Sequence, residues 1–390
     1  MAAPSAPAPS CLAIGGETYH LTWLRDNCTC AQCRDPGSFQ KLFDISLAGR
    51  RPAMLRHAID GDTLHIVWDE APLHESRYSL AWLARQPVRI ASIEQQVLPA
   101  LWGADTWNRQ PLPWHALPAE PSDTQAWQND LLRLGFVLFR DVELDALDRF
   151  VSAIGPIHYT EYGRFAHIRS SIGAQDLSES GCALTPHTDY STYMHTAPLL
   201  QFLYFKVNAA SGGETVLVDG FQAAADFRRD HPEAFSILVE TPIEFQQFYQ
   251  GWRYHFIRRR PIIELNEAGD ISGVFFGHSH CFNWKLAPER VDAFYEAYVA
   301  FFRCLKHPDY QLVVKLQAGE CVAVQNGRLL HGRRAFDPTS GDRHLIDAYV
   351  PWEYFIARLN FLRDQADFCA DSCVDSCVST SPIPAGRMMA

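Results

Sequence analysis

The sequence lacks an excess of basic residues and has no long apolar segment. Among its 390 residues, 34 lysines and arginines are outnumbered by 45 aspartates and glutamates, which gives a formal net charge of −11. Proteins that bind nucleic acid or anionic membranes carry basic surfaces, so this chain is a poor candidate for either. No apolar run approaches the ~20 residues of a transmembrane helix. We therefore expect no nucleic-acid partner and no membrane partner.

The N-terminus also lacks the features of a secretion signal. The first ten residues, MAAPSAPAPS, contain neither a basic region nor a long apolar stretch. Their composition predicts a disordered tail over residues 1–10, and we expect a cytoplasmic protein. The cysteine count is 11, an odd number. Without an export signal, these cysteines are expected to be thiols or metal ligands rather than a disulfide framework.

Hydrophobic residues are plentiful, at 47% of the chain, which is enough for one large core and a smaller domain. We predict a small β-rich domain over residues 11–100, a connector over 101–123, a larger domain over 124–365 and a C-terminal tail over 366–390. The connector is expected to pack against other segments because it carries three tryptophans: Trp102, Trp107 and Trp114.

The larger domain alternates strand-like and helix-like segments. Residues 199–207, 212–219 and 343–350 are rich in Phe, Val and Leu and are expected to be strands, and residues 220–239 a helix. Such strands with flanking helices predict a mainly β fold of the double-stranded β-helix, or jelly-roll, type.

Three closely spaced cysteines mark the small domain. Cys28, Cys30 and Cys33 lie in the segment NCTCAQCR, and packing does not explain such spacing. A tetrahedral zinc site would need one further ligand. Three histidines are candidates: His57, His65 and His74. His65 lies inside an expected strand, whereas His74 follows it at a turn and is preferred. With four protein ligands no coordination position stays open, so a structural role is predicted.

The segment LTPHTDYSTY carries the chemistry of the larger domain. His187 and Asp189 are two residues apart, and on an extended strand such residues point to the same face. A second histidine, His331, follows an apolar run far downstream, and Arg343 comes 12 residues after it. Two histidines and one carboxylate form the facial triad of non-haem iron(II) sites. A lone His-x-Asp could equally be a surface turn, but the distal His–Arg pair favours the metal site.

With these residues in view, the chain resembles the γ-butyrobetaine dioxygenase family within the taurine dioxygenase-like iron(II)/2-oxoglutarate oxygenases. The resemblance covers about residues 12–362. Its most specific segments are WLRDNCTCAQC, PHTDYS, GGETVLVDGF, LLHGRRAF and RHLIDAYV. The combination of the cysteine-rich segment with the His-Thr-Asp segment is more specific than either segment alone.

The resemblance implies a role for each motif. Structural zinc(II) would be held by Cys28, Cys30, Cys33 and His74. Iron(II) would be held by the catalytic residues His187, Asp189 and His331. The 2-oxoglutarate cosubstrate would contact Arg343 and Thr215. The implied reaction uses O2 and 2-oxoglutarate to hydroxylate an unactivated C–H bond and yields succinate and CO2. A homodimer is also expected from the family.

The substrate pocket departs from the pattern of the family, whose members bind a trimethylammonium group in an aromatic cage. Tyr162, Tyr190 and Tyr349 are the aromatic residues expected to contact the substrate. However, Ala166 stands at a cage tryptophan position, and Glu179 lies at or near a cage tyrosine position.

We therefore predict a less methylated or primary amine, such as a small amino acid or a relative of 2-aminoethylphosphonate. Its amine would meet Glu179, and its anionic end would meet His278, Arg164 or Arg169.

Two alternatives differ from hydroxylation of a small zwitterion. Oxidative demethylation or desaturation would use the same iron site, and detection of formaldehyde would favour demethylation. A zinc-stabilised binding scaffold without catalysis is the other, and the complete set of His187, Asp189, His331 and Arg343 argues against it.

Overall fold

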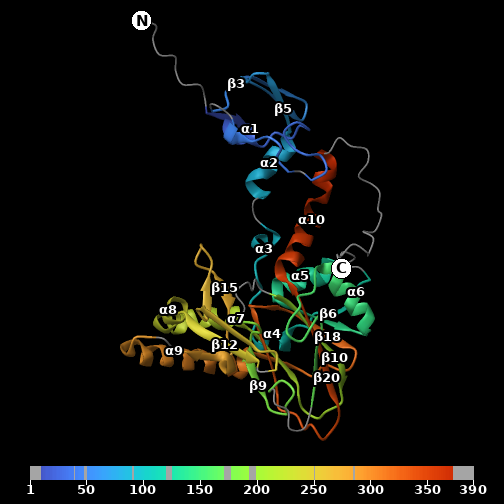
Figure 1. Cartoon of the computed structure of the whole chain (residues 1–390), viewed down its shortest axis with the longest axis vertical. Helices are drawn as coiled ribbons and strands as arrows, with labels where there is room; N and C mark the ends of the chain where they lie inside the picture. Colours follow the sequence, from blue (N-terminus) through green and yellow to red (C-terminus); the bar gives the residue numbers. More distant parts are fainter. Residues whose placement is uncertain are drawn as a thin grey trace. The chain divides into compact units, whose positions relative to one another are not determined.

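A computed structural model describes residues 10–38, 40–47, 51–89, 92–119, 125–170, 177–192, 199–249, 251–283 and 286–371. The expected tails fall largely outside these ranges, which exclude residues 1–9 and 372–390. The chain divides into two compact units (Figure 1). The smaller unit comprises residues 1–92 and 361–390, and the larger comprises residues 93–360. Within the described ranges, no helix is both long enough and apolar enough to cross a membrane.

The smaller unit is β-rich, as predicted. Its strands are β1 (Cys11–Ile14), β2 (Glu17–His20), β3 (Met54–Asp60), β4 (Thr63–Trp68) and β5 (His74–Ser79). Its helices are α1 (Leu21–Asp26), α2 (Leu80–Arg89) and the short η1 (Ile45–Leu47). Strands β3, β4 and β5 form one antiparallel sheet. In β4, Leu64, Ile66 and Trp68 are fully buried while the residues between them are half-buried. This period of two fixes which face of the sheet meets the core.

The larger unit is built on ten hydrogen-bonded strands. They are β6 (Trp114–Ala116), β7 (Phe136–Arg140), β8 (Ala166–Arg169), β9 (Leu184–His187), β10 (Leu199–Asn208), β11 (Thr215–Asp219), β17 (Gln311–Val314), β18 (Glu320–Asn326), β19 (Leu329–Arg333) and β20 (Arg343–Pro351). Strands β18 and β19 are joined by a single residue pair, Asn326 and Leu329. The strands therefore fall into two halves, one running β6-β7-β18-β10-β20-β8 and the other β17-β11-β19-β9.

Side chains from both halves meet in one core. Leu203 and Phe205 of β10 pack in the same buried cluster as Leu217 of β11 and Leu312 of β17. Neighbouring residues of β10, such as Phe202, point to the opposite face and pack in a different cluster. Two packed sheets with helices outside them fit the predicted mainly β, jelly-roll architecture.

Helices cover the outer faces of both halves. One set packs on β10, β18 and β20 and consists of α5 (Gln125–Leu134), α6 (Leu144–Ile154) and the start of α10 (Trp352–Asp371). The other set packs on β11 and β19 and consists of α7 (Gly220–Asp230), α8 (Pro232–Glu240) and α9 (Pro288–Lys306). Figure 1 shows α7, α8 and α9 gathered with β12 and β15 beside the strands. The single helix expected over residues 220–239 is two helices, because Pro232 cannot continue α7 and instead starts α8.

The remaining elements of the larger unit line its edges. They are α3 (Ile93–Gln96), α4 (Ala104–Arg109), β12 (Ile243–Tyr249), β13 (Tyr254–Arg260), β14 (Ile263–Leu265), β15 (Ile271–Val274), β16 (Cys281–Asn283), and the short helices η2 (His278–His280) and η3 (Pro308–Tyr310). The connector packs as expected, because Trp102 is buried with its ring 5.2 Å from that of Trp107 and 5.3 Å from that of Phe136.

Candidate active site

Two histidines face each other across neighbouring strands of the larger unit. His187 ends β9, and His331 lies in the middle of β19. The two residues are direct partners in the antiparallel ladder, and their ring centroids are 4.4 Å apart. Strand pairing therefore brings together residues that are 144 positions apart in the sequence, since 331 − 187 = 144. Both imidazoles are presented from rigid backbone, which is what a metal site requires.

Asp189 joins the histidines from a tight turn. The next residue, Tyr190, has a left-handed backbone with φ of 54°, so the chain turns sharply after the carboxylate. The Asn326 side chain fixes the turn from both sides. Its Oδ1 accepts a hydrogen bond from the Asp189 backbone N–H at 2.9 Å, and its Nδ2 donates to the Asp189 carbonyl oxygen at 3.0 Å.

The three side chains converge on one point. Asp189 Oδ1 lies 3.4 Å from His187 Nε2, and Asp189 Oδ2 lies 3.6 Å from His331 Nε2. Candidate ligand atoms from all three residues lie within 4.8 Å of one another. His187 Nδ1 lies 2.8 Å from the Thr185 carbonyl oxygen. A ring nitrogen that donates there leaves Nε2 unprotonated and available to a metal.

Burial and charge favour the ligating protonation states of His331 and Asp189, whereas the raised pKa of His187 favours its protonated form. Burial lowers the pKa of His331 to about 4. Burial also opposes ionisation of Asp189, but His331 and His187 hold the pKa of that carboxyl well below its usual range. Burial lowers the pKa of His187, yet Asp189 raises it by more. An ionised carboxylate beside a neutral imidazole is the form that binds a divalent cation.

Two further side chains support Asp189 from behind. Gln201 Nε2 donates to Asp189 Oδ2 at 2.8 Å, and the Tyr349 hydroxyl lies 2.7 Å from the same oxygen. Gln201 and Tyr349 also contact a second buried carboxylate, Asp347, at 2.9 and 2.5 Å. Burial and the nearby Asp189 raise the pKa of Asp347 well above its ordinary value.

The metal-type cluster opens into a cavity between the two halves of the sheet. Its polar lining includes His187, Asp189, His331, Thr215, Arg343 and Asp347. Its apolar walls come from Ile168, Leu184, Leu203, Phe205 and Leu345. A small anion entering this space would reach both the three-ligand cluster and the guanidinium of Arg343.

Arg343 is a buried cation without a carboxylate beside it. Its side chain is 5% exposed, and within the described ranges its Nε has no hydrogen-bond partner and its guanidinium makes no ion pair. The rings of Phe205 and Phe336 lie 5.4 and 5.6 Å from it. Burial, with a smaller effect from Arg333, lowers the pKa of Arg343 to about 10. A buried guanidinium needs an anion, and a carboxylate matches its planar fork. The cavity therefore fits a carboxylate ligand at this end, next to Thr215 on β11.

Arg333, on the strand of His331, holds the segment that precedes β9. Its guanidinium donates to the carbonyl oxygens of Ser178, Ser180 and Cys182 at 2.6 to 2.8 Å. No sequence motif assigns this arginine a role, because its partners are backbone atoms of a distant loop.

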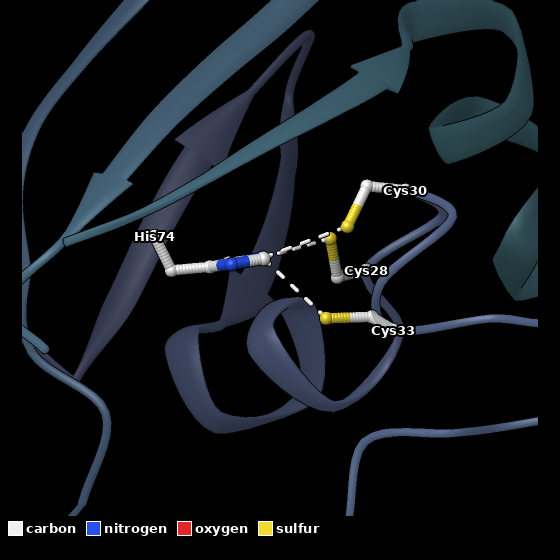
Figure 2. Close-up of side chains that lie close together, drawn as sticks. All are labelled: Cys28, Cys30, Cys33 and His74. Atoms are coloured by element: carbon white, nitrogen blue, oxygen red, sulfur yellow. Dashed lines mark hydrogen bonds between the residues drawn. The ribbon is translucent and has the colours of Figure 1, made fainter. Parts of the chain in front are cut away.

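The smaller unit holds a second cluster of metal-type ligands. Figure 2 shows His74 reaching toward Cys28, Cys30 and Cys33. His74 Nε2 lies 3.3, 3.8 and 3.5 Å from the three sulfur atoms in that order. Metal–ligand bonds of about 2.1–2.3 Å at tetrahedral angles would place sulfur and nitrogen about 3.5 Å apart. Of the three candidate histidines, it is His74 that the fold places beside the cysteines.

The thiols of this cluster differ in their surroundings. Burial raises the pKa of Cys28 to about 12. Arg25 donates to Cys33 Sγ at 3.3 Å and pairs with Glu70 at 2.6 Å, so a fixed cation lies beside the cluster. A metal ion would replace the thiol protons and remove the cost of these buried sulfur atoms.

Comparison with known proteins shows where this chain belongs. Residues 95–349 match the model of the family described as taurine catabolism dioxygenase TauD, TfdA family. The chain belongs to this family. Residues 15–84 match a second model, gamma-butyrobetaine hydroxylase-like, N-terminal. Family membership confirms the predicted enzyme class, an iron(II)/2-oxoglutarate-dependent dioxygenase.

Curated relatives align along almost the whole chain. A gamma-butyrobetaine dioxygenase from Pseudomonas sp. (strain AK-1) is 28% identical, over 88% of this chain and 90% of its own. The protein of that name from Homo sapiens is 25% identical over 90% and 92%. A trimethyllysine dioxygenase from Meyerozyma guilliermondii is 27% identical over 87% and 89%.

Of the three predicted aromatic residues, Tyr190 and Tyr349 lie close to the metal ligand Asp189. The rings of Tyr190 and Tyr349 meet edge to face with centroids 4.9 Å apart, and both side chains are buried. Tyr162 is 38% exposed and contacts two rings that the sequence did not single out. They are Tyr249 at 5.9 Å and Trp252 at 5.0 Å, both from the β12–β13 hairpin. The aromatic composition of residues 245–254 was the available signal, but it is equally typical of a packed surface.

The predicted polar contacts to substrate lie outside the lining of the iron-site cavity. Arg164 pairs with Asp148 of α6 at 2.5 Å, and Arg169 is exposed on β8. His278 lies in η2, with its Nδ1 2.8 Å from the Tyr298 hydroxyl. Glu179 is half-buried in the loop before β9. The remaining part of that loop, residues 171–176, is outside the described ranges. Substrate contacts by these four residues stay predictions.

Proposed function

We propose that this TauD-family dioxygenase hydroxylates an unactivated C–H bond of a small zwitterionic amine. One observation carries the proposal. A three-ligand cluster of His187, Asp189 and His331 shares a cavity with the buried, carboxylate-free guanidinium of Arg343. This arrangement suits a metal with open coordination positions and a dianionic cosubstrate that reaches from the metal to Arg343.

Each side chain would have a defined task. His187, Asp189 and His331 would hold iron(II) through Nε2, a carboxylate oxygen and Nε2. Arg343 would pair with the far carboxylate of 2-oxoglutarate, and the Thr215 hydroxyl would donate a further hydrogen bond to it. When bound, iron and 2-oxoglutarate supply the oxidation, in which O2 converts a C–H bond to C–OH while 2-oxoglutarate becomes succinate and CO2.

The protein supplies placement and exclusion of water. Leu203, Phe205 and Leu345 wall the cavity beside the cosubstrate position. Gln201 and Tyr349 hold the Asp189 carboxylate by hydrogen bonds and would thereby orient it toward a bound metal. Correct placement of one C–H bond is what separates coupled hydroxylation from unproductive turnover.

The substrate class rests on two independent features. The relatives are named for γ-butyrobetaine and trimethyllysine, both of which are small zwitterions with a trimethylammonium group and a carboxylate. Tyr190 and Tyr349 lie beside Asp189, and aromatic faces attract cations. A cation held here would bring the neighbouring carbons of the substrate to the metal.

The Cys28, Cys30, Cys33 and His74 cluster would hold structural zinc in the smaller unit. Sulfur-to-nitrogen distances of 3.3 to 3.8 Å support this assignment. A homodimer is part of the proposal because the family resemblance predicts one.

The test is succinate formation from 2-oxoglutarate after O2 is added to iron-loaded enzyme. The candidate substrates are γ-butyrobetaine, trimethyllysine, 2-aminoethylphosphonate and its N-methylated series. We expect at least one zwitterion to stimulate succinate formation and to gain one oxygen atom by mass spectrometry. Formaldehyde in place of a hydroxylated product would mean demethylation, and the absence of any stimulation would contradict the proposed substrate class.

A further inference from the structure

Asp347 is a buried carboxylate that the proposed chemistry leaves without a task. It lies on β20, where Arg343, Leu345, Asp347 and Tyr349 alternate with residues of the other face. Like Arg343 and Leu345, it lines the cavity of the metal-type cluster. Its side chain is 3% exposed. A carboxylate this deep in a protein is retained only when something in the site uses it.

Only one of its two oxygen atoms is satisfied. Oδ2 accepts a hydrogen bond from Gln201 Nε2 at 2.9 Å and lies 2.5 Å from the Tyr349 hydroxyl. Oδ1 is buried and has no hydrogen-bond partner within the described ranges. A buried acceptor without a donor is costly, so its persistence points to a donor that arrives with a ligand.

No cation of the described chain meets this carboxylate. Within the described ranges, Asp347 makes no ion pair with lysine, arginine or histidine. Arg343 lies on the same strand, but four residues of extended chain separate the two by about 13 Å. The cavity therefore has a cationic end at Arg343 and a carboxyl group without a cationic partner at Asp347, near the ligand Asp189.

The neighbouring strand presents only a small side chain to Asp347. Its direct partner on β8 is Ala166, a buried residue with only one side-chain carbon. In antiparallel strands, directly paired residues share a face, so the space beside the carboxylate is bounded by a methyl group. The Tyr349 ring, two residues along β20, and the adjacent Tyr190 ring provide an aromatic surface close by.

We propose that Asp347 Oδ1 accepts a hydrogen bond from the substrate ammonium group and thereby selects an amine that retains at least one N–H. This inference rests on the proposed function and narrows its substrate class to primary, secondary and tertiary ammonium zwitterions. A quaternary trimethylammonium carries no N–H and leaves Oδ1 unsatisfied. It is also too bulky to approach an oxygen atom as closely as an N–H donor does. A hydrogen bond between charged groups in a buried site corresponds to a discrimination of about 10-fold to 100-fold.

A purely positioning role for Asp347 predicts a different outcome. Asp347 shares Gln201 and Tyr349 with Asp189, so its removal could loosen the iron ligand instead of the substrate site. In that case iron affinity and substrate-free 2-oxoglutarate turnover would fall, and all amines would be affected equally.

The experiment compares matched amine pairs with and without Asp347. The pairs are 4-aminobutyrate with γ-butyrobetaine, and 2-aminoethylphosphonate with its N-trimethyl derivative. Binding is measured by calorimetry on full-length enzyme loaded with manganese and N-oxalylglycine, which block turnover. Succinate formation is measured separately on iron-loaded enzyme. The variants are Asp347→Ala and, as matched control, Asp342→Asn, an exposed carboxylate in the turn before β20.

We expect the wild type and Asp342→Asn to bind the primary amine of a pair at least about 10-fold more tightly than the trimethylated one. Asp347→Ala should abolish this preference by weakening binding of the primary amine much more than binding of its trimethylated partner. A preference of the wild type for the trimethylated partner would overturn the inference. An equal loss for both partners in Asp347→Ala, with weaker iron binding, would also overturn it and assign Asp347 a positioning role.

A second variant keeps the test decisive if Asp347→Ala does not fold. Ala166→Leu leaves the carboxylate in place and fills the space beside it, and it should weaken binding of the primary amine by at least about 10-fold. Unchanged binding in Ala166→Leu would overturn the inference. The proposed function fails by a different readout, namely absence of amine-stimulated succinate formation in the wild type, whatever the calorimetry shows.

Discussion

The two clusters of metal-type ligands in this chain differ in the number of ligands that they supply. In the smaller unit, Cys28, Cys30, Cys33 and His74 supply four ligand atoms. In the larger unit, His187, Asp189 and His331 supply three ligand atoms and line a cavity. Four protein ligands complete a tetrahedral zinc site, whereas three leave positions for cosubstrate and O2. The number of ligands, together with the presence of a cavity, separates a structural site from a catalytic one.

Support for the ligands differs in the same way. Arg25 donates a hydrogen bond to the sulfur atom of Cys33 and is itself held by an ion pair with Glu70. Around Asp189, hydrogen bonds from Asn326, Gln201 and Tyr349 fix the backbone and one carboxylate oxygen. The contact to Cys33 supports a site that is closed by four ligands. The contacts to Asp189 orient one of three ligands and leave the cavity side of the cluster accessible.

The largest expected effect comes from opening the closed cluster. Cys28→Ser should abolish binding of one zinc per chain and unfold the smaller unit, because structural zinc binding contributes roughly 10–16 kcal/mol to small zinc domains. Zinc content by mass spectrometry and limited proteolysis of the smaller unit would measure this. Cys11→Ser, which removes an exposed thiol of the same unit, is the control and should change neither. Full zinc content in Cys28→Ser would show that the cluster is not a closed site.

Removing the cationic end of the open site should have the next largest effect. Arg343→Ala should raise the KM for 2-oxoglutarate by about 10-fold to 100-fold, because charged hydrogen bonds contribute about 1.5–3 kcal/mol. Arg343→Lys should recover only part of this loss, since an ammonium lacks the planar fork. Arg228→Ala, at an exposed arginine of α7, serves as control. An unchanged KM in Arg343→Ala would remove Arg343 from the cosubstrate site.

Loosening the turn that carries Asp189 should have a smaller effect. Asn326→Ala removes both hydrogen bonds to the Asp189 backbone, and loss of such supporting contacts typically weakens metal binding by about 10-fold to 100-fold. Iron titration should show the weaker affinity, and excess iron should restore most of the turnover. Asn266→Ala, in the exposed turn between β14 and β15, should leave iron binding unchanged. If Asn326→Ala bound iron normally, the turn would not depend on this side chain.

The smallest expected effect comes from an ion pair outside both clusters. The Arg164 guanidinium holds the pKa of Asp148 below its usual range, so the pair stabilises the fold above the unfolded pKa of about 4 and loses this contribution as pH falls through the lower folded value. Arg164→Gln should therefore lower the free energy of unfolding by less than about 1 kcal/mol at pH 7. Urea unfolding from pH 7 downward should show the gap closing, and a gap that widened in acid would contradict this sign.

Sequence reasoning succeeded where the chemistry is local. His187 and Asp189 share a face because of a two-residue spacing, and Cys28, Cys30 and Cys33 are close because the loop is short. The alternation in β4 predicted its buried face for the same reason. Two long-range partners, His331 and His74, were also singled out from the sequence, and the fold places His331 beside His187 and Asp189 and His74 beside the three cysteines.

What the sequence did not reveal depends on register between distant strands. Nothing in the segment RHLIDAYV indicates that Asp347 has a special environment. Only strand pairing shows that it lies opposite Ala166 and beside Gln201. Tyr249 and Trp252 reach Tyr162 only because β12 and β13 form a hairpin. Neither composition nor spacing encodes such contacts.

The error over residues 220–239 had a local cause. A single helix was wrong because Pro232 starts a new one, and a proline at that position is a signal that the sequence does contain.

The most direct test of the open-site account is O2-dependent succinate formation in the wild type and in Asp189→Ala. Both proteins would be loaded with iron anaerobically and checked for equal zinc content, so that the closed cluster is intact in each. We expect succinate formation by the wild type and a rate more than about 100-fold lower in Asp189→Ala, because the variant lacks one of the three iron ligands. Equal succinate formation by the two proteins, or none by the wild type, would contradict the claim that His187, Asp189 and His331 form the catalytic iron site.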